Sequence, residues 1–70
     1  MEILHSIVIG NEELDFVSQG LRQMKEDSRN EEQILIVKRD GDFRYGLRLI
    51  RYANGVGIDA FKEREPVKIT

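Results

Sequence analysis

The sequence contains no cysteine, no tryptophan, one proline and one histidine among its 70 residues. Without cysteine, neither a disulfide framework nor a cysteine-ligated metal site can stabilise the chain. The longest apolar run, residues 34–37, has four residues and is far too short to form a membrane-spanning helix. Residues 1–3 lack the basic start and apolar core of a signal peptide, so we expect a cytoplasmic protein without membrane association.

The remaining composition is typical of a folded domain, with 40% hydrophobic and 34% charged residues. Residues 1–70 are long enough for a single domain. A domain of this size buries only about 60% of the surface that its unfolded chain exposes, so its stability alone is marginal. We therefore expect self-association into a homo-oligomer to supplement the small core.

A strand followed by a helix is predicted for the first part of the chain. Residues 2–9 are rich in β-branched side chains and predict a strand. Residues 12–29 predict a helix, with Asn11 as its N-cap and Asn30 as a left-handed residue at its end. Gly20 lies within the apolar stripe of this helix, which predicts close approach to a sheet. The stripe consists of Leu14, Phe16, Val17, Leu21 and Met24.

The rest of the chain predicts a β-meander. Strands are expected over 32–39, 42–53 and 56–62, with a short last strand over 67–70 after Pro66. Asp40-Gly41 and Asn54-Gly55 predict two-residue hairpin turns with positive φ at both positions. The fold class is therefore α+β: a small β-α-β-β-β(-β) domain. Its mixed sheet of three or four strands is covered on one face by one helix, and the place of the first strand in the sheet is left open.

These turns set the strand register, and the register divides the side chains between two faces. The face expected beneath the helix carries Ile34, Ile36, Phe43, Tyr45, Leu47, Leu49, Ala53, Val56, Ile58 and Ala60. The opposite face combines apolar side chains with arginines, which is typical of an interaction site. Tyr52 is expected opposite Gly57, and Arg48 opposite Phe61 in a cation–π contact. The candidate interaction residues are Leu35, Val37, Arg39, Arg44, Arg48, Ile50, Tyr52 and Phe61.

The net charge of −2 conceals an uneven distribution. Residues 1–37 carry a net charge of −5, whereas residues 38–52 carry +3 and residues 53–70 are balanced. The basic block also contains aromatic side chains, a combination found in single-stranded nucleic-acid platforms. Nucleic-acid binding by hairpin 38–61 is therefore an alternative to protein binding. Two features oppose it: an isoelectric point near 5.3, and the option that acids of the helix neutralise the arginines.

Signals for catalysis are weak. His5 lies in the inward-alternating row of the first strand, so we interpret it as a partly buried structural residue. No histidine pair, serine triad or phosphate-binding loop is recognisable, so we expect no enzyme activity, no cofactor and no metal. The sequence favours a protein-interaction module that binds itself or another protein. A small-molecule site enclosed by an oligomer, with Tyr52 and Phe61 as stacking surfaces, is a third hypothesis.

Overall fold

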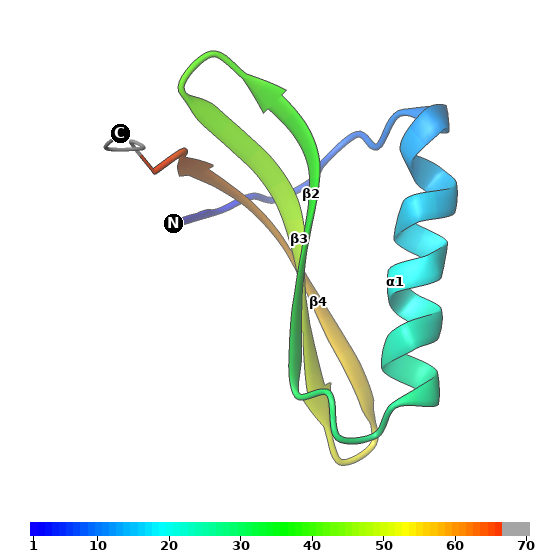
Figure 1. Cartoon of the computed structure of the whole chain (residues 1–70). Helices are drawn as coiled ribbons and strands as arrows, with labels where there is room; N and C mark the ends of the chain where they lie inside the picture. Colours follow the sequence, from blue (N-terminus) through cyan, green and yellow to red (C-terminus); the bar gives the residue numbers. More distant parts are fainter. Residues whose placement is uncertain (67–70) are drawn as a thin grey trace.

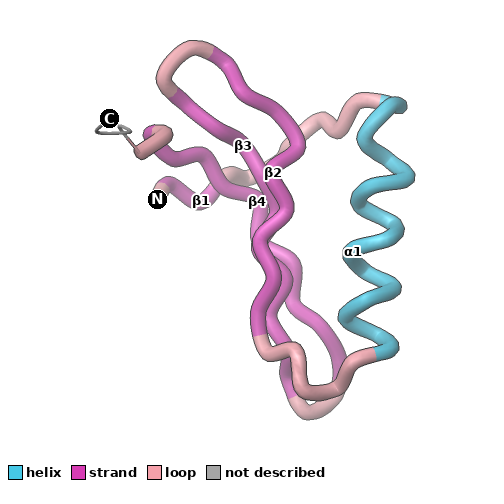
Figure 2. Tube along the Cα trace, viewed as in Figure 1, coloured by secondary structure: helices cyan, strands magenta, loops and turns pink. Residues whose placement is uncertain are grey.

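The computed structural model describes residues 1–66 and confirms a small α+β domain (Figure 1). A two-residue strand β1 (Glu2–Ile3) is followed by a 3₁₀ turn η1 (Asn11–Glu13) and helix α1 (Leu14–Glu26). Three long strands follow: β2 (Glu32–Asp40), β3 (Phe43–Tyr52) and β4 (Gly55–Arg64). Figure 2 shows the strands on one side and the helix on the other. The strand predicted over 67–70 lies outside the described residues.

The sheet has the order β1-β4-β3-β2, and every neighbouring pair is antiparallel. The expectation of a mixed sheet was wrong, because β1 lies beside β4 and runs opposite to it. β1 is also much shorter than the predicted strand 2–9. Only Glu2 and Ile3 pair with β4, and the Leu4 amide then donates to the Ala60 carbonyl at 2.8 Å. After this bond the chain leaves the sheet edge and crosses to the start of α1 (Figure 1).

The β2–β3 hairpin differs from the predicted register. Asp40 pairs with Phe43, so the loop residues are Gly41 and Asp42 rather than Asp40 and Gly41. Gly41 has φ of +60°, and no other described residue has positive φ. A register shift between Ile36 and Lys38 marks a β-bulge. Because one extra residue inverts the side-chain alternation, residues 32–37 of β2 present the opposite face to the helix from the one predicted, whereas Lys38 and Arg39 keep their predicted faces.

Leu35 and Val37 therefore point toward α1, where they are buried. Ile34 and Ile36, predicted for the core, lie on the helix-free face instead. Ile34 is 42% exposed there. This exchange is the main correction to the predicted core.

The β3–β4 hairpin keeps its predicted faces but shifts its register by two residues. Tyr52 pairs with Gly55, so Ala53 and Asn54 form the loop, and Ala53 is exposed rather than part of the core. The observed register places Arg48 opposite Asp59 and Arg44 opposite Glu63. The predicted register would have placed Arg48 opposite Phe61. Opposite charges directly across two strands stabilise their pairing, so both pairs favour the observed register.

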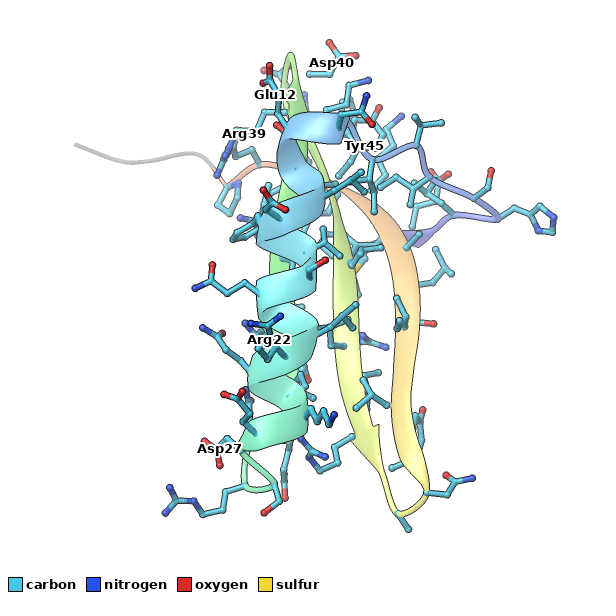
Figure 3. The ribbon with its side chains drawn as sticks, turned by 90° about the vertical axis from the view of Figure 1, so that its right-hand side faces the viewer. Glu12, Arg22, Asp27, Arg39, Asp40 and Tyr45 are labelled. Atoms are coloured by element: carbon cyan, nitrogen blue, oxygen red, sulfur yellow. The ribbon has the colours of Figure 1, made fainter. Side chains whose placement is uncertain are left out.

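The core lies between α1 and the middle of β2 and β3. Val17, Gly20 and Met24 are the buried residues of α1. Figure 3 shows the helix in front of part of the sheet, with β4 extending beyond it. Consequently Ile58 on β4 is 53% exposed although it lies on the helix side of the sheet, and Phe43 near the hairpin end is 37% exposed. The buried cluster consists of Val17, Met24, Leu35, Val37, Leu47 and Leu49.

Backbone and arginine groups, rather than the predicted asparagine caps, hold the ends of α1. Asn11 makes no side-chain cap; instead the Glu13 amide donates to the Gly10 carbonyl at 3.0 Å. Asn30 does not have a left-handed backbone. At the C-terminal end, Arg51 of β3 donates to the carbonyl oxygens of Met24, Asp27 and Asn30. A strand side chain therefore binds carbonyl groups at the C-terminal end of α1 and in the loop that follows it.

Gly20 brings α1 close to β2, as the sequence predicted. A Cβ at this position would lie 2.7 Å from Cδ1 and 2.8 Å from Cδ2 of Leu35. Gly20→Ala gains about 1 kcal/mol of helix propensity but crowds the buried Leu35 side chain by about 2 kcal/mol. We expect a net loss of about 1 kcal/mol in the free energy of unfolding, measured by urea titration.

The exposed helix residue Ser18 provides the control, because Ser18→Ala should be neutral or slightly stabilising. A gain of stability in Gly20→Ala would contradict the close approach of α1 to Leu35.

Candidate association surface on the helix-free face

The sheet face turned away from α1 contains most of the predicted interaction residues, but not all of them. Leu35 and Val37 are absent because the bulge turns them into the core. Ile34 and Ile36 take their place on β2, and the sequence analysis did not select them for this face. The predicted residues that do lie there are Arg39, Arg44, Arg48, Ile50, Tyr52 and Phe61.

Gly46 is the sequence feature that could have predicted that Ile34 and Ile36 replace Leu35 and Val37 on this face. A glycine inside a strand often marks a bulge or a close backbone approach. A Cβ on Gly46 would lie 2.3 Å from the Leu35 carbonyl oxygen and 2.9 Å from Cζ of Phe61. The missing side chain therefore leaves room for both the β2 backbone and an aromatic ring.

Phe61 is completely buried although it lies on the helix-free face. It pairs with Gly46, and its ring occupies the space above that glycine. The neighbouring cross-strand pairs on this face are Arg44 with Glu63 on one side and Arg48 with Asp59 on the other. Phe61 is thus a structural residue beneath these side chains. The expected Arg48–Phe61 cation–π contact is not among the ring contacts of the described residues.

The arginines of this face are bound to acids of the same chain. Arg39 Nε lies 2.7 Å from Glu65 Oε1. Arg44 Nη2 lies 2.5 Å from Glu63 Oε1, and Arg48 Nη2 lies 3.3 Å from an Asp59 oxygen. The acids come from β4 and the residue just after it, not from α1. The charges on the face therefore occur as neighbouring opposite pairs rather than as a row of free cations.

The exposed apolar surface of this face comes from Tyr52, from Ile34 and from Ile3 of β1, which pairs with Phe61 and is 56% exposed. Tyr52 is 57% exposed, and its ring lies over Gly57, diagonally across from it rather than directly opposite. Ile50 and Ile36 are half-buried beside these side chains. A shallow depression adjoins the Tyr52 end and is lined by Ser28, Glu31, Glu32, Ile50, Arg51, Tyr52 and Ala53. The result is an open surface of apolar and paired polar groups.

Metal-ligating side chains are not assembled within the described residues. His5 is exposed, contrary to the expectation that it is partly buried. Within residues 1–66, no three His, Asp or Glu side chains form a cluster that could hold a metal ion. In the same range no helix has the length and apolar character needed to cross a membrane.

Comparison with known proteins gives no relative for this chain: no family model, curated protein or solved structure matches it.

Proposed function

We propose that this protein is a non-enzymatic association module that binds a protein through its helix-free face. The observation that carries the proposal is the pairing of Arg39, Arg44 and Arg48 with acids beside exposed Tyr52 and Ile34. Aromatic and arginine side chains are enriched where proteins bind each other. A surface of paired charges and apolar groups suits a partner that is itself mixed in polarity.

Single-stranded nucleic acid is the less favoured ligand. Its affinity would come mainly from neutralising phosphates with free cations, and the arginines of this face already have carboxylate partners. Phe61, one of the two expected stacking residues, is buried and cannot stack on a base.

A photo-crosslinking experiment tests protein binding. Tyr52 is replaced by p-benzoylphenylalanine in the native host, and Gln19 on the exposed side of α1 receives the same replacement as a control. We expect a discrete protein adduct from position 52 and none from position 19. Equal labelling at both positions, or no protein adduct at all, would contradict the proposal. A fluorescence-anisotropy titration with single-stranded oligonucleotides at low salt should show no binding, and salt-sensitive binding would favour the alternative.

A further inference from the structure

The outer edge of β2 is unpaired in the described part of the chain, because β2 pairs only with β3. The Arg51 amide donates to the Glu31 carbonyl at 2.9 Å, so this pair belongs to the hydrogen-bonded set of the antiparallel ladder. Such pairs alternate with pairs whose main-chain groups point outward. The N–H and C=O groups of Glu32, Ile34 and Ile36 therefore point to the free edge.

The side chains along this edge complement those of the same strand in a second copy that runs antiparallel to it. Residues 32–39 begin with an acid, continue through Ile34-Leu35-Ile36-Val37, and end with Lys38 and Arg39. Antiparallel pairing centred on Leu35 places Ile34 opposite Ile36 of a second copy, both with outward main-chain groups. When the bulge at Val37 is counted as one extra residue, Glu32 comes opposite Arg39 of the second copy. Both side chains then lie on the helix-free face.

We propose that two copies of this chain associate through their β2 edges and form one continuous eight-stranded antiparallel sheet. The two-fold axis passes near Leu35, so each copy contributes the same residues to the interface. The dimer covers the 42% exposed Ile34 and pairs the open main-chain groups of β2. This inference goes beyond the proposed function, because it uses the β2 edge rather than the helix-free face and names a second copy as the partner.

The helix provides a further, independent match to this arrangement. A two-fold axis through the joined sheet places both copies of α1 on the same side of it. Phe16 lies two turns from Gln23 on one flank of α1, and Gln23 accepts a hydrogen bond from Gln33 of β2 at 3.0 Å. This flank therefore faces the β2 edge. Phe16 is 46% exposed in one chain, and the helix of the second copy would lie beside it.

The other sheet edge also has an unpaired part but lacks this complementarity. β1 pairs with Lys62 and Phe61 only, which leaves Gly55–Asp59 of β4 open. This segment carries two glycines, no base and a single acid, Asp59. Antiparallel pairing of this segment with the same segment of a second copy places no opposite charges across from each other.

Sedimentation velocity at roughly 100 μM tests the dimer with two matched variants. The wild-type chain should sediment with twice its mass of 8.2 kDa. Ile34→Lys on β2 should raise the dimer Kd by roughly tenfold or more, whereas Ile58→Lys on β4 should leave it unchanged. Both isoleucines are about half exposed, so circular dichroism should show both variants folded. A monomeric wild type, or a dimer lost in Ile58→Lys and retained in Ile34→Lys, would overturn the proposal.

Charge exchange tests the register. Glu32→Arg and Arg39→Glu should each weaken the homodimer, because each places like charges opposite each other. Mixing the two variants places opposite charges at both positions and should restore a dimer that contains one chain of each. Failure of the mixture to associate would overturn the pairing about Leu35.

The crosslinking experiment separates this inference from the proposed function. If the wild type is a dimer and position 52 gives no protein adduct, the proposed function fails and the dimer is retained. If the wild type is monomeric and position 52 still gives a protein adduct, only the dimer fails.

Discussion

Gly46→Ala is expected to lower the free energy of unfolding by about 3 kcal/mol, the upper end of typical overpacking effects. The added Cβ would meet the Leu35 carbonyl oxygen at 2.3 Å, and backbone of a paired strand cannot move away as a flexible side chain can. It would also press on the buried Phe61 ring. For a domain of this size the loss corresponds to a decrease of about 15 °C in Tm, measured by thermal circular dichroism.

Gly55→Ala is the matched control. Gly55 lies at the start of β4, has no positive φ, and a Cβ there would have no heavy atom within 4 Å. We expect this variant to be neutral or more stable by up to about 1 kcal/mol, because alanine restricts the unfolded chain. If the two variants have the same Tm, the close approach of β2 to Gly46 is contradicted.

Arg51→Met is expected to destabilise the protein by about 2 kcal/mol through the loss of charge-assisted hydrogen bonds. Methionine keeps the apolar length of the side chain but removes the guanidinium that binds the carbonyls of Met24, Asp27 and Asn30. These bonds join the end of α1 and the following loop to β3. Urea denaturation measures the loss. Amide hydrogen exchange should show the largest loss of protection in the last turn of α1 and in residues 27–31.

Two comparisons give this prediction its specificity. Arg22 lies on the side of α1 turned away from the sheet (Figure 3) and has no hydrogen-bond or ion-pair partner among the described residues, so Arg22→Met should change stability by less than about 0.5 kcal/mol. Arg51→Lys should recover part of the loss, because one ammonium cannot reach all of the carbonyls that the guanidinium fork reaches. Equal effects of Arg22→Met and Arg51→Met would contradict the capping role.

Gly46 and Arg51 both affect the association surface indirectly. Gly46 allows Phe61 to lie flat against the sheet, which keeps that ring out of solvent and leaves Tyr52 as the exposed aromatic group of the face. Arg51 places one positive charge of the basic block, residues 38–52, at the C-terminal end of α1. The composition of residues 38–52 indicated a basic platform, whereas the structure distributes these charges among individual partners.

The sequence predicted the elements whose signals are local. Helix α1, the position of Gly20 against the sheet and the three long strands follow from periodicity over neighbouring residues. Of the predicted apolar stripe only Val17 and Met24 are buried, whereas Leu14, Phe16 and Leu21 are exposed. The faces of β3 and β4 were also correct, because a two-residue register shift preserves the alternation. Placement of the helix caps failed. Asn11 was expected to cap α1 with its side chain and Asn30 to end it with a left-handed backbone, whereas the C-terminal end is held by Arg51 of a distant strand.

The sequence by itself therefore determined an α+β domain with one amphipathic helix, a β-meander and an arginine-rich hairpin. Tertiary structure decided which side chains form the core and which form the surface. A single extra residue at Val37 inverts the alternation of β2, so Leu35 enters the core and Ile34 becomes exposed. Beside this bulge, the Leu35 carbonyl lies against the bare Gly46 of the neighbouring strand. Cross-strand ion pairs such as Arg48 with Asp59 accompany the observed register of β3 and β4. Contacts between residues far apart in the chain therefore set the strand register and the choice of buried face, which local periodicity could not predict.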